Sequence, residues 1–168
     1  MVQNELAWVL ETIAEQWPGD DAFGDEEIVR VNRDKPEILE TGDRTRSVEL
    51  SNANVISATR ASRSRTPSGT RFNYDVETVV SVRIEGLHES EWGHVADDDD
   101  FERLVRYAQH AINLERTYPE IDADDDIGRV AYQDARIENE QPVSNEHRDH
   151  YRTDFDVRLR GRECLPEP

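Results

Sequence analysis

The chain has 168 residues, with 38 acidic and 20 basic side chains and a formal net charge of -18. Its single cysteine, Cys164, excludes an intrachain disulfide framework and a cysteine metal cluster. No apolar run approaches the roughly 18 residues of a membrane-spanning helix, and the acidic N-terminus lacks the cationic region of a signal peptide. We therefore expect one domain, residues 1–168, kept in the cytoplasm or packaged into a particle assembled there.

The positive charge is supplied almost entirely by arginine, because Lys35 is the only lysine. An acid excess with almost no lysine predicts adaptation to molar salt, where charges are screened over about 3 Å and self-repulsion is weak. The alternatives are an ordinary acidic surface or an acidic disordered protein. Three tryptophans, five tyrosines and regular apolar periodicity argue against disorder.

The first predicted element is an amphipathic helix that ends at Pro18-Gly19. Its apolar stripe consists of Leu6, Val9, Leu10, Ile13 and Trp17. Trp8 lies just off the stripe, and is either part of the core or an exposed anchor for a neighbouring subunit.

Shorter strand patterns follow this helix. Residues 28–31 predict a short strand, and residues 34–43 predict a loop rich in turn residues and charges. Residues 47–50 and 55–62 predict further strand segments. We expect a hairpin with its tip near Pro67-Ser68-Gly69 to join them to the next strand.

Two longer segments alternate with the period of two expected of half-buried strands. Residues 74–85 place apolar or neutral side chains on one face and mostly charged ones on the other, and only Val79 breaks the pattern. Residues 151–160 alternate throughout, from Tyr151 to Arg160. A slip of one residue would put charges in the core, so the register is strongly determined.

A second amphipathic helix is predicted between these strands, over residues 101–114. Asp99 and Glu102 have capping-box spacing at its start, and Pro119 is expected to end it. Its apolar stripe consists of Phe101, Leu104, Val105, Ala108 and Ile112.

The last pair of strands completes an α+β pattern. Residues 127–132 and 135–140 predict one strand interrupted near Gln133-Asp134, and residues 141–148 predict the turn into the final strand. We expect a mainly antiparallel sheet with two principal helices packed on one face and a protruding β-hairpin. The hairpin arm spans about residues 54–74, and a loose C-terminal tail of about 161–168 carries the free thiol of Cys164.

The arm carries an unusual distribution of charge for so acidic a chain. Residues 51–74 contain no acidic side chain, whereas four arginines fall within residues 60–71. We hypothesise that these arginines bind acidic surfaces of neighbouring subunits or of an adjoining protein, with facing DNA as a secondary possibility. The simpler alternative is a solvated polar hairpin. The four residues are Arg60, Arg63, Arg65 and Arg71.

No motif predicts catalysis, a cofactor or a metal. The segment from His88 to Trp92 begins like the zinc motif HExxH, but Trp92 replaces the second histidine. His88 and His94 lack a defined ligand spacing, and His147 and His150 are expected to be solvated. Phosphate loops, dinucleotide fingerprints and nucleophile elbows are also missing from the sequence. We therefore predict a protein that is not an enzyme.

The order of elements resembles the tail terminator, or tail-completion, proteins of long-tailed viruses. The resemblance rests on an N-terminal helix, the strand segment Asn73-Tyr74-Asp75-Val76, the strand and helix of residues 80–112, and the final segment RIENEQPVSNEHRDHYRTDFDVRLRG. It covers most of the chain from Asn73 onward and, weakly, the first helix. Residues 28–70 are less like the family.

The resemblance implies a small α+β subunit that forms a ring, usually of six copies, at the head-proximal end of the tail tube. Such a ring ends tube growth and binds a neck or connector protein, while genomic DNA passes through without specific binding. The acidic composition then implies a virus of a halophilic archaeon, with the protein located in the virion tail or neck after assembly in the host cytoplasm. No membrane partner is implied.

Two alternatives remain open. One is a neck adaptor or stopper, or another tail-associated virion protein of similar size. The other is a haloarchaeal cytoplasmic enzyme or ligand-binding domain of α+β type, with its site built from dispersed residues.

Overall fold

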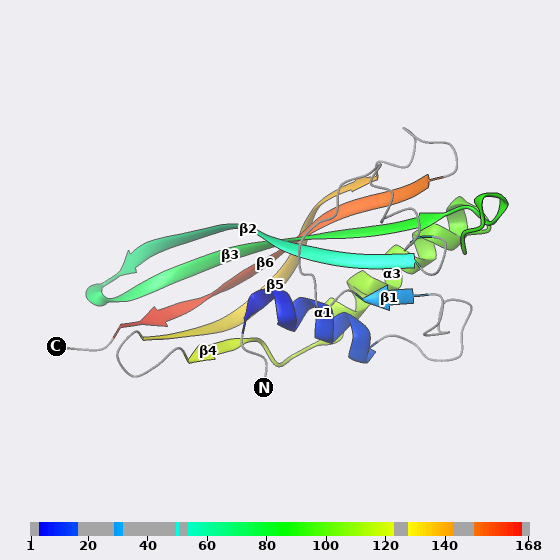
Figure 1. Cartoon of the computed structure of the whole chain (residues 1–168). Coiled ribbons are helices and arrows are strands. Elements are labelled where there is room, and N and C mark those ends of the chain that lie inside the picture. Colours follow the sequence, from blue (N-terminus) through cyan, green and yellow to red (C-terminus); the bar gives the residue numbers. More distant parts are fainter. Residues whose placement is uncertain are drawn as a thin grey trace.

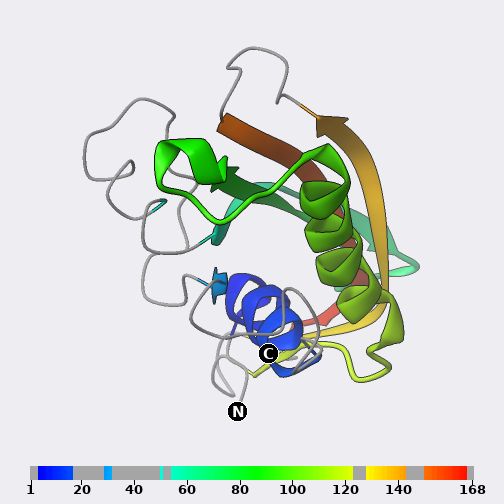
Figure 2. The same ribbon diagram turned by 90° about the vertical axis from the view of Figure 1, so that its right-hand side faces the viewer.

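The computed structural model describes residues 4–16, 29–31, 50, 54–122, 128–142 and 150–165. They form an α+β fold in which an antiparallel five-stranded sheet curls into a half-barrel and two helices pack on one face of it (Figure 1 and Figure 2). The predicted fold class is therefore confirmed.

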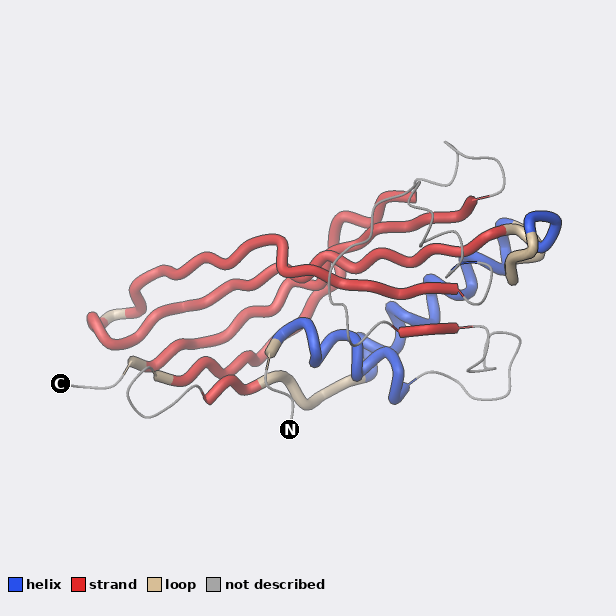
Figure 3. Tube along the Cα trace, in the orientation of Figure 1, coloured by secondary structure: helices blue, strands red, loops and turns tan. Residues whose placement is uncertain are grey.

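The strands pair in the order β1-β2-β3-β6-β5-β4 (Figure 3). Strand β1 adds to the edge of β2 in parallel, and all the other neighbours are antiparallel. The strands span Val29–Val31 (β1), Asn54–Ser68 (β2), Thr70–Leu87 (β3), Glu120–Asp122 (β4), Arg129–Pro142 (β5) and His150–Cys164 (β6).

The two alternating strands, β3 and β6, are neighbours in the centre of the sheet. Val82 lies opposite Phe155 and Val80 opposite Val157, and all four side chains are buried. The charged residues between them lie on the other face. The predicted register of both strands is therefore confirmed, and this face forms the core against the helices.

Helix α1 spans Glu5–Gln16 and begins at Asn4, whose side-chain oxygen accepts a hydrogen bond from the Ala7 N–H at 2.7 Å. Trp8 is 4% exposed, and its indole Nε1 donates to the Thr117 carbonyl at 2.9 Å. Of the two alternatives for Trp8, the structure therefore supports the core. Trp17 and the expected end of the helix at Pro18-Gly19 lie outside the described residues.

Helix α3 spans Asp98–Leu114, so it ends at the predicted residue, Leu114, but begins before the predicted start. The N-cap is Asp97, which accepts a hydrogen bond from the Asp100 N–H at 2.8 Å, so the predicted box of Asp99 and Glu102 does not form the cap. The helix ends well before Pro119. The Glu115 carboxylate instead accepts the N–H groups of the two following residues, and this local contact favours extended backbone at Glu115. The predicted apolar stripe is buried as expected.

Three further sequence predictions are resolved along the chain. Gly69, with φ of 82°, lies at the tip of the β2–β3 hairpin, as predicted. The predicted interruption of β5 is a β-bulge between Tyr132 and Asp134. The predicted strand 47–50 is wrong at Leu50, which is helical, and its other residues lie outside the described part of the chain.

The expected tail begins later than predicted. Strand β6 continues to Cys164, with Gly161 opposite Val76 and Cys164 opposite Asn73. A Cβ on Gly161 would lie 2.1 Å from the Ala131 carbonyl oxygen, so only glycine allows β5 to approach so closely. The Cys164 thiol is free and exposed, but it belongs to the sheet.

Candidate functional site

The predicted arginine patch lies on the outer half of the β2–β3 hairpin, which we call the arm (residues 59–81, in which Thr59 pairs with Ser81). Strand β2 is buried from Asn54 to Ala58 and exposed from Arg60 to Pro67. Beyond Ile56, no described strand pairs with its outer edge, because β1 reaches only residues 54–56. The arm therefore presents a free sheet edge among the described residues, and it extends to one end of the molecule (Figure 1).

A β-bulge determines the side of the sheet on which the arginines lie. Arg60 pairs with Val80 and Arg63 pairs with Thr78, because the register shifts between Arg60 and Ser62. In a regular strand, two residues three positions apart point to opposite faces. The extra residue, Ala61, therefore brings Arg60 and Arg63 to the same face.

Both of these arginines bind one buried carboxylate of helix α1. Glu5 has no exposed surface, and its Oε2 accepts a hydrogen bond from Arg60 Nη2 at 2.9 Å. Its Oε1 accepts from Arg63 Nη2 and, at 2.7 Å, from the Tyr132 hydroxyl. Glu5 therefore joins α1 to strands β2 and β5.

The hydrogen bonds around Glu5 form a single chain. Arg63 Nε donates to Thr78 Oγ1 at 3.3 Å, and the Thr78 and Tyr132 hydroxyl oxygens are 2.7 Å apart. Because Tyr132 donates its only proton to Glu5, the Thr78 hydroxyl must donate to Tyr132. The hydroxyl groups of Thr78 and Tyr132 thereby each donate one hydrogen bond and accept one.

This network shifts the ionisation of its members. Burial alone would raise the pKa of Glu5, but the Tyr132 hydrogen bond and the guanidinium groups of Arg63 and Arg60 lower it below its usual value. Burial, aided by the nearby Glu5 charge, raises the pKa of Tyr132 to about 12. The fold therefore favours an ionised Glu5 and a neutral Tyr132.

Arg65 contacts a different carboxylate. Its Nη2 donates to Glu163 Oε1 at 2.6 Å, and Glu163 is 5% exposed. The other oxygen, Glu163 Oε2, is buried without a hydrogen-bond partner in the described part of the chain. Arg71 follows the hairpin tip in β3, and its side chain lies outside the described residues.

The three arginines with described side chains therefore bind two different carboxylates. Arg60 and Arg63 bind Glu5, Arg65 binds Glu163, and their side chains are 43%, 32% and 49% exposed, respectively. The sequence prediction missed Glu5 as the acceptor of Arg60 and Arg63. The sequence did indicate that Glu5 is buried, because Glu5 lies four residues before Val9 and therefore on the same buried side of the helix.

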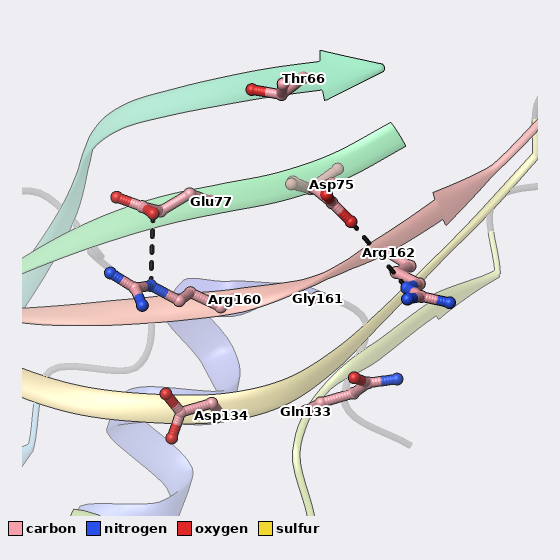
Figure 4. A pocket seen from close by; sticks show the side chains of 9 residues that line it. Thr66, Asp75, Glu77, Gln133, Asp134, Arg160, Gly161 and Arg162 are labelled. Carbon is pink, nitrogen blue, oxygen red and sulfur yellow. Dashed lines mark ion pairs between the residues drawn. The ribbon is translucent and has the colours of Figure 1, made fainter. Parts of the chain in front are cut away.

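The opposite face of the arm carries a network of ion pairs rather than apolar side chains. Arg160 Nε lies 3.3 Å from Glu77 Oε2, and Arg162 Nε lies 3.9 Å from Asp75 Oδ1 (Figure 4). Arg158 contacts both Glu77 and Glu138. Of these residues, Asp75, Glu77, Arg160 and Arg162 border a polar groove of about 420 Å³ over the β5 bulge.

The expectation of solvated histidines is wrong for His150. Its Nε2 lies 2.9 Å from Oε2 of Glu85, and Glu85 is fully buried. Nearby, Arg83 and Arg152 both bind Asp154. Burial would raise the pKa of Asp154, but these two arginines lower it. His147 lies outside the described residues.

His88 has a local structural contact on each ring nitrogen. Its Nδ1 accepts the Ser90 N–H at 3.0 Å, and its Nε2 lies 2.9 Å from the Ala96 carbonyl oxygen. His88 thus caps the short helix η1 (Glu89–Glu91). No group of three or more potential metal ligands occurs among the described residues.

None of the described helices combines the length and the apolar character needed to cross a membrane. No family model matches the sequence, and a search of curated proteins finds no match.

Proposed function

We propose that this chain is a ring-forming structural subunit of the tail-terminator type, from a virus whose host lives in high salt. In this role, copies of the chain form a ring, of six subunits by the family resemblance, on the tail tube. The ring ends tube growth and binds a neck protein. The proposal combines the sequence resemblance with the architecture of the arm.

The observation that carries the proposal is the free edge of β2. A long unpaired strand edge is a template for pairing with another chain, and native proteins usually keep such edges short or covered. Here the arm projects its edge at one end of the molecule, with no acidic residue over residues 51–74. An edge of this kind suits a contact with a neighbouring subunit.

The acidic composition explains why arginine would be used in this contact. At 1 M salt, charges more than about 3 Å apart are largely screened, so long-range attraction contributes little. A guanidinium bound directly to a carboxylate keeps its geometry and more of its energy. Arg65, which is half exposed and already 2.6 Å from Glu163, has such a geometry at the arm. We expect Arg65 and Arg71 to contribute most, because Arg65 is the most exposed of the three described arginine side chains and Arg71 is the arginine nearest the hairpin tip.

The test is the native mass of the purified chain in molar salt, measured by light scattering and followed by negative-stain electron microscopy. The proposal predicts ring-shaped particles with a mass that is a multiple of 19.4 kDa. Replacing Arg65 and Arg71 by Gln should weaken the assembly, whereas the matched pair Arg103 and Arg106 on α3, replaced in the same way, should not.

A parent chain that is monomeric at every concentration would contradict the proposed self-assembly. The arginines of the arm would then serve only to keep its edge from pairing with other chains. A monomer that bound a small ligand in the groove of Figure 4 would favour the alternative of a binding domain or enzyme.

A further inference from the structure

Trp92 is the most exposed large apolar side chain in the described part of the molecule, at 85%. It lies in the turn between β3 and α3, directly after η1. A tryptophan left in water contributes nothing to the core, and tryptophan is among the residues most enriched at the energetic centres of interfaces. Its position therefore needs an explanation beyond folding.

The backbone at Trp92 is unusual for such a residue. Its φ of 65° and ψ of 22° are in the left-handed region, where a bulky side chain is rare. Such strain is unfavourable and persists only where the surrounding structure enforces it. Glycine would adopt this conformation without strain, so the fold here keeps an indole at an energetic cost.

The turn that holds Trp92 is tightly bonded. We call residues 88–95 the Trp92 turn. The Trp92 N–H donates to the Glu89 carbonyl at 3.2 Å, and the Val95 N–H donates to Leu87 at 3.0 Å. A Cβ on Gly93 would lie only 2.0 Å from the Leu87 carbonyl oxygen, so the turn packs directly on the end of β3. The indole is therefore presented on a rigid support, which lowers the entropy lost on binding.

Acidic side chains surround the Trp92 turn in the sequence, and no arginine or lysine occurs between Arg83 and Arg103. Most of these acids are exposed. An indole bordered by carboxylates fits a partner that offers guanidinium groups, because arginine both stacks on the indole face and binds carboxylates. The acids are Glu89, Glu91, Asp97, Asp98, Asp99, Asp100 and Glu102.

The arm of the same chain has the complementary chemistry, at the other end of the molecule. Strand β3 runs from the hairpin tip at Thr70 to Leu87, where the Trp92 turn begins (Figure 1 and Figure 3). At about 3.3 Å per residue, a strand of this length places the hairpin tip roughly 55 Å from the turn, and Arg65, which pairs with Val76, roughly 35 Å from it. The two surfaces therefore cannot meet within one copy.

We propose that the Trp92 turn is a docking surface for the arginine-bearing arm of a second copy of this chain. Because the two surfaces differ, the contact is heterologous and repeats from copy to copy, as a closed ring requires. The inference rests on the proposed self-assembly, and it names the surface that receives the arm. Trp92 would stack on a guanidinium of the arm, with Glu89 and Glu91 binding its neighbours.

The first experiment removes the indole while keeping the turn. Trp92→Gly suits the left-handed backbone, so the chain should stay folded, with unchanged circular dichroism. We expect its assembly in molar salt, followed by analytical ultracentrifugation, to weaken by about tenfold or more in Kd. The control Leu114→Ala removes the other large apolar side chain that is exposed in the described part of the chain, at 50%, and should assemble like the parent.

The second experiment tests whether the arm of a second copy is the surface that binds the Trp92 turn. In a Cys164→Ser background, one preparation carries Ser90→Cys and another carries Ser64→Cys, both at exposed positions, which leave Trp92, Glu89, Glu91 and the arginines in place. A short bis-maleimide should link the two in a mixture but neither alone. As a control, Leu114→Cys in place of Ser90→Cys should give no link.

The outcomes separate the two proposals. If the parent assembles and Trp92→Gly assembles equally well, this inference is wrong and the proposed function stands. If Trp92→Gly dissociates but the cysteines do not link, the Trp92 turn binds some other surface, and the arm is not its occupant. A monomeric parent would remove both proposals.

Discussion

Glu5 connects the arm to the helical layer through a single side chain. It accepts hydrogen bonds from Arg60, Arg63 and Tyr132 and has no exposed surface. A buried carboxylate without such partners would be strongly destabilising, and each donor would lose its acceptor if Glu5 were removed. The position of the arm against α1 therefore depends on this carboxylate.

Replacing Glu5 by Gln should lower the free energy of unfolding by about 1 to 3 kcal/mol, because two guanidinium groups lose a charged acceptor while shape is kept. Urea denaturation in constant molar salt would measure it. The matched control Glu15→Gln lies on the same helix at an exposed position and should change stability by less than about 0.5 kcal/mol. Equal stability of both variants and the parent would show that the Glu5 contacts contribute nothing.

Tyr132 should make the fold sensitive to alkaline pH. Its pKa is raised from 10.0 to about 12 in the folded chain, so the native state holds this proton more tightly than the unfolded state. The stability from this difference is fully present below pH 10 and is lost as the pH rises from 10 to about 12. Urea midpoints across this range should fall in the parent and fall less in Tyr132→Phe, and parallel curves would contradict the assignment.

At the scale of elements, the central strands β3 and β6 carry the fold. Their inward side chains meet the stripes of α1 and α3, and their outward side chains form the ion-pair network beside the groove. Their neighbours β2 and β5 contain bulges, which bend these strands and allow the sheet to curl around the helices. Changes on the inward face should therefore be far more costly than changes on the outward one.

Phe155→Asp should prevent folding, because Phe155 is 1% exposed opposite Val82 and an aspartate there would be an unpaired buried charge. Its cost of several kcal/mol is comparable with the whole stability of a domain, roughly 5 to 15 kcal/mol. Near-ultraviolet circular dichroism and native mass would show the loss. Phe155→Leu, the control, keeps an apolar side chain and should fold, and a folded, soluble Phe155→Asp chain would contradict the assigned core.

At the scale of the whole molecule, the net charge of -18 is spread over a fold of only 168 residues. Most arginines with described side chains form ion pairs, as Arg83, Arg152 and Arg158 do within the sheet. Many of the other described acids, such as Asp98 and Asp99 at the start of α3, are exposed. Such a surface repels itself unless salt screens it.

We therefore expect folding to depend on salt. Lowering the ionic strength from 1 M to 0.01 M lengthens the Debye distance from about 3 Å to about 30 Å, so carboxylates would repel across the whole domain. Far-ultraviolet circular dichroism during dialysis would record the loss of structure, and returning the salt should restore it. Full structure retained in dilute buffer would count against adaptation to high salt.

The sequence by itself determined the elements whose side chains follow a period. The alternation of Val80, Val82, Phe155 and Val157, and the stripe of α3, depend only on which residues share a face, so a local pattern is sufficient to predict them. Element ends were less predictable. Helix α3 is capped by Asp97 and Glu115, but the sequence offers several neighbouring acids as alternative N-caps and Pro119 as an alternative end. The periodic pattern does not distinguish among these candidates.

Only the tertiary structure decided the contacts of the candidate sites. The bulge at Ala61 turns Arg63 toward Glu5, which is 58 positions away in the chain, and the pairing of β3 with β6 brings His150 to Glu85. The exposure of Trp92 likewise depends on the packing of its turn against β3. Such contacts depend on strand register and on bulges, which bring distant segments of the chain together. The periodicity of a sequence indicates only which residues share a face within one segment.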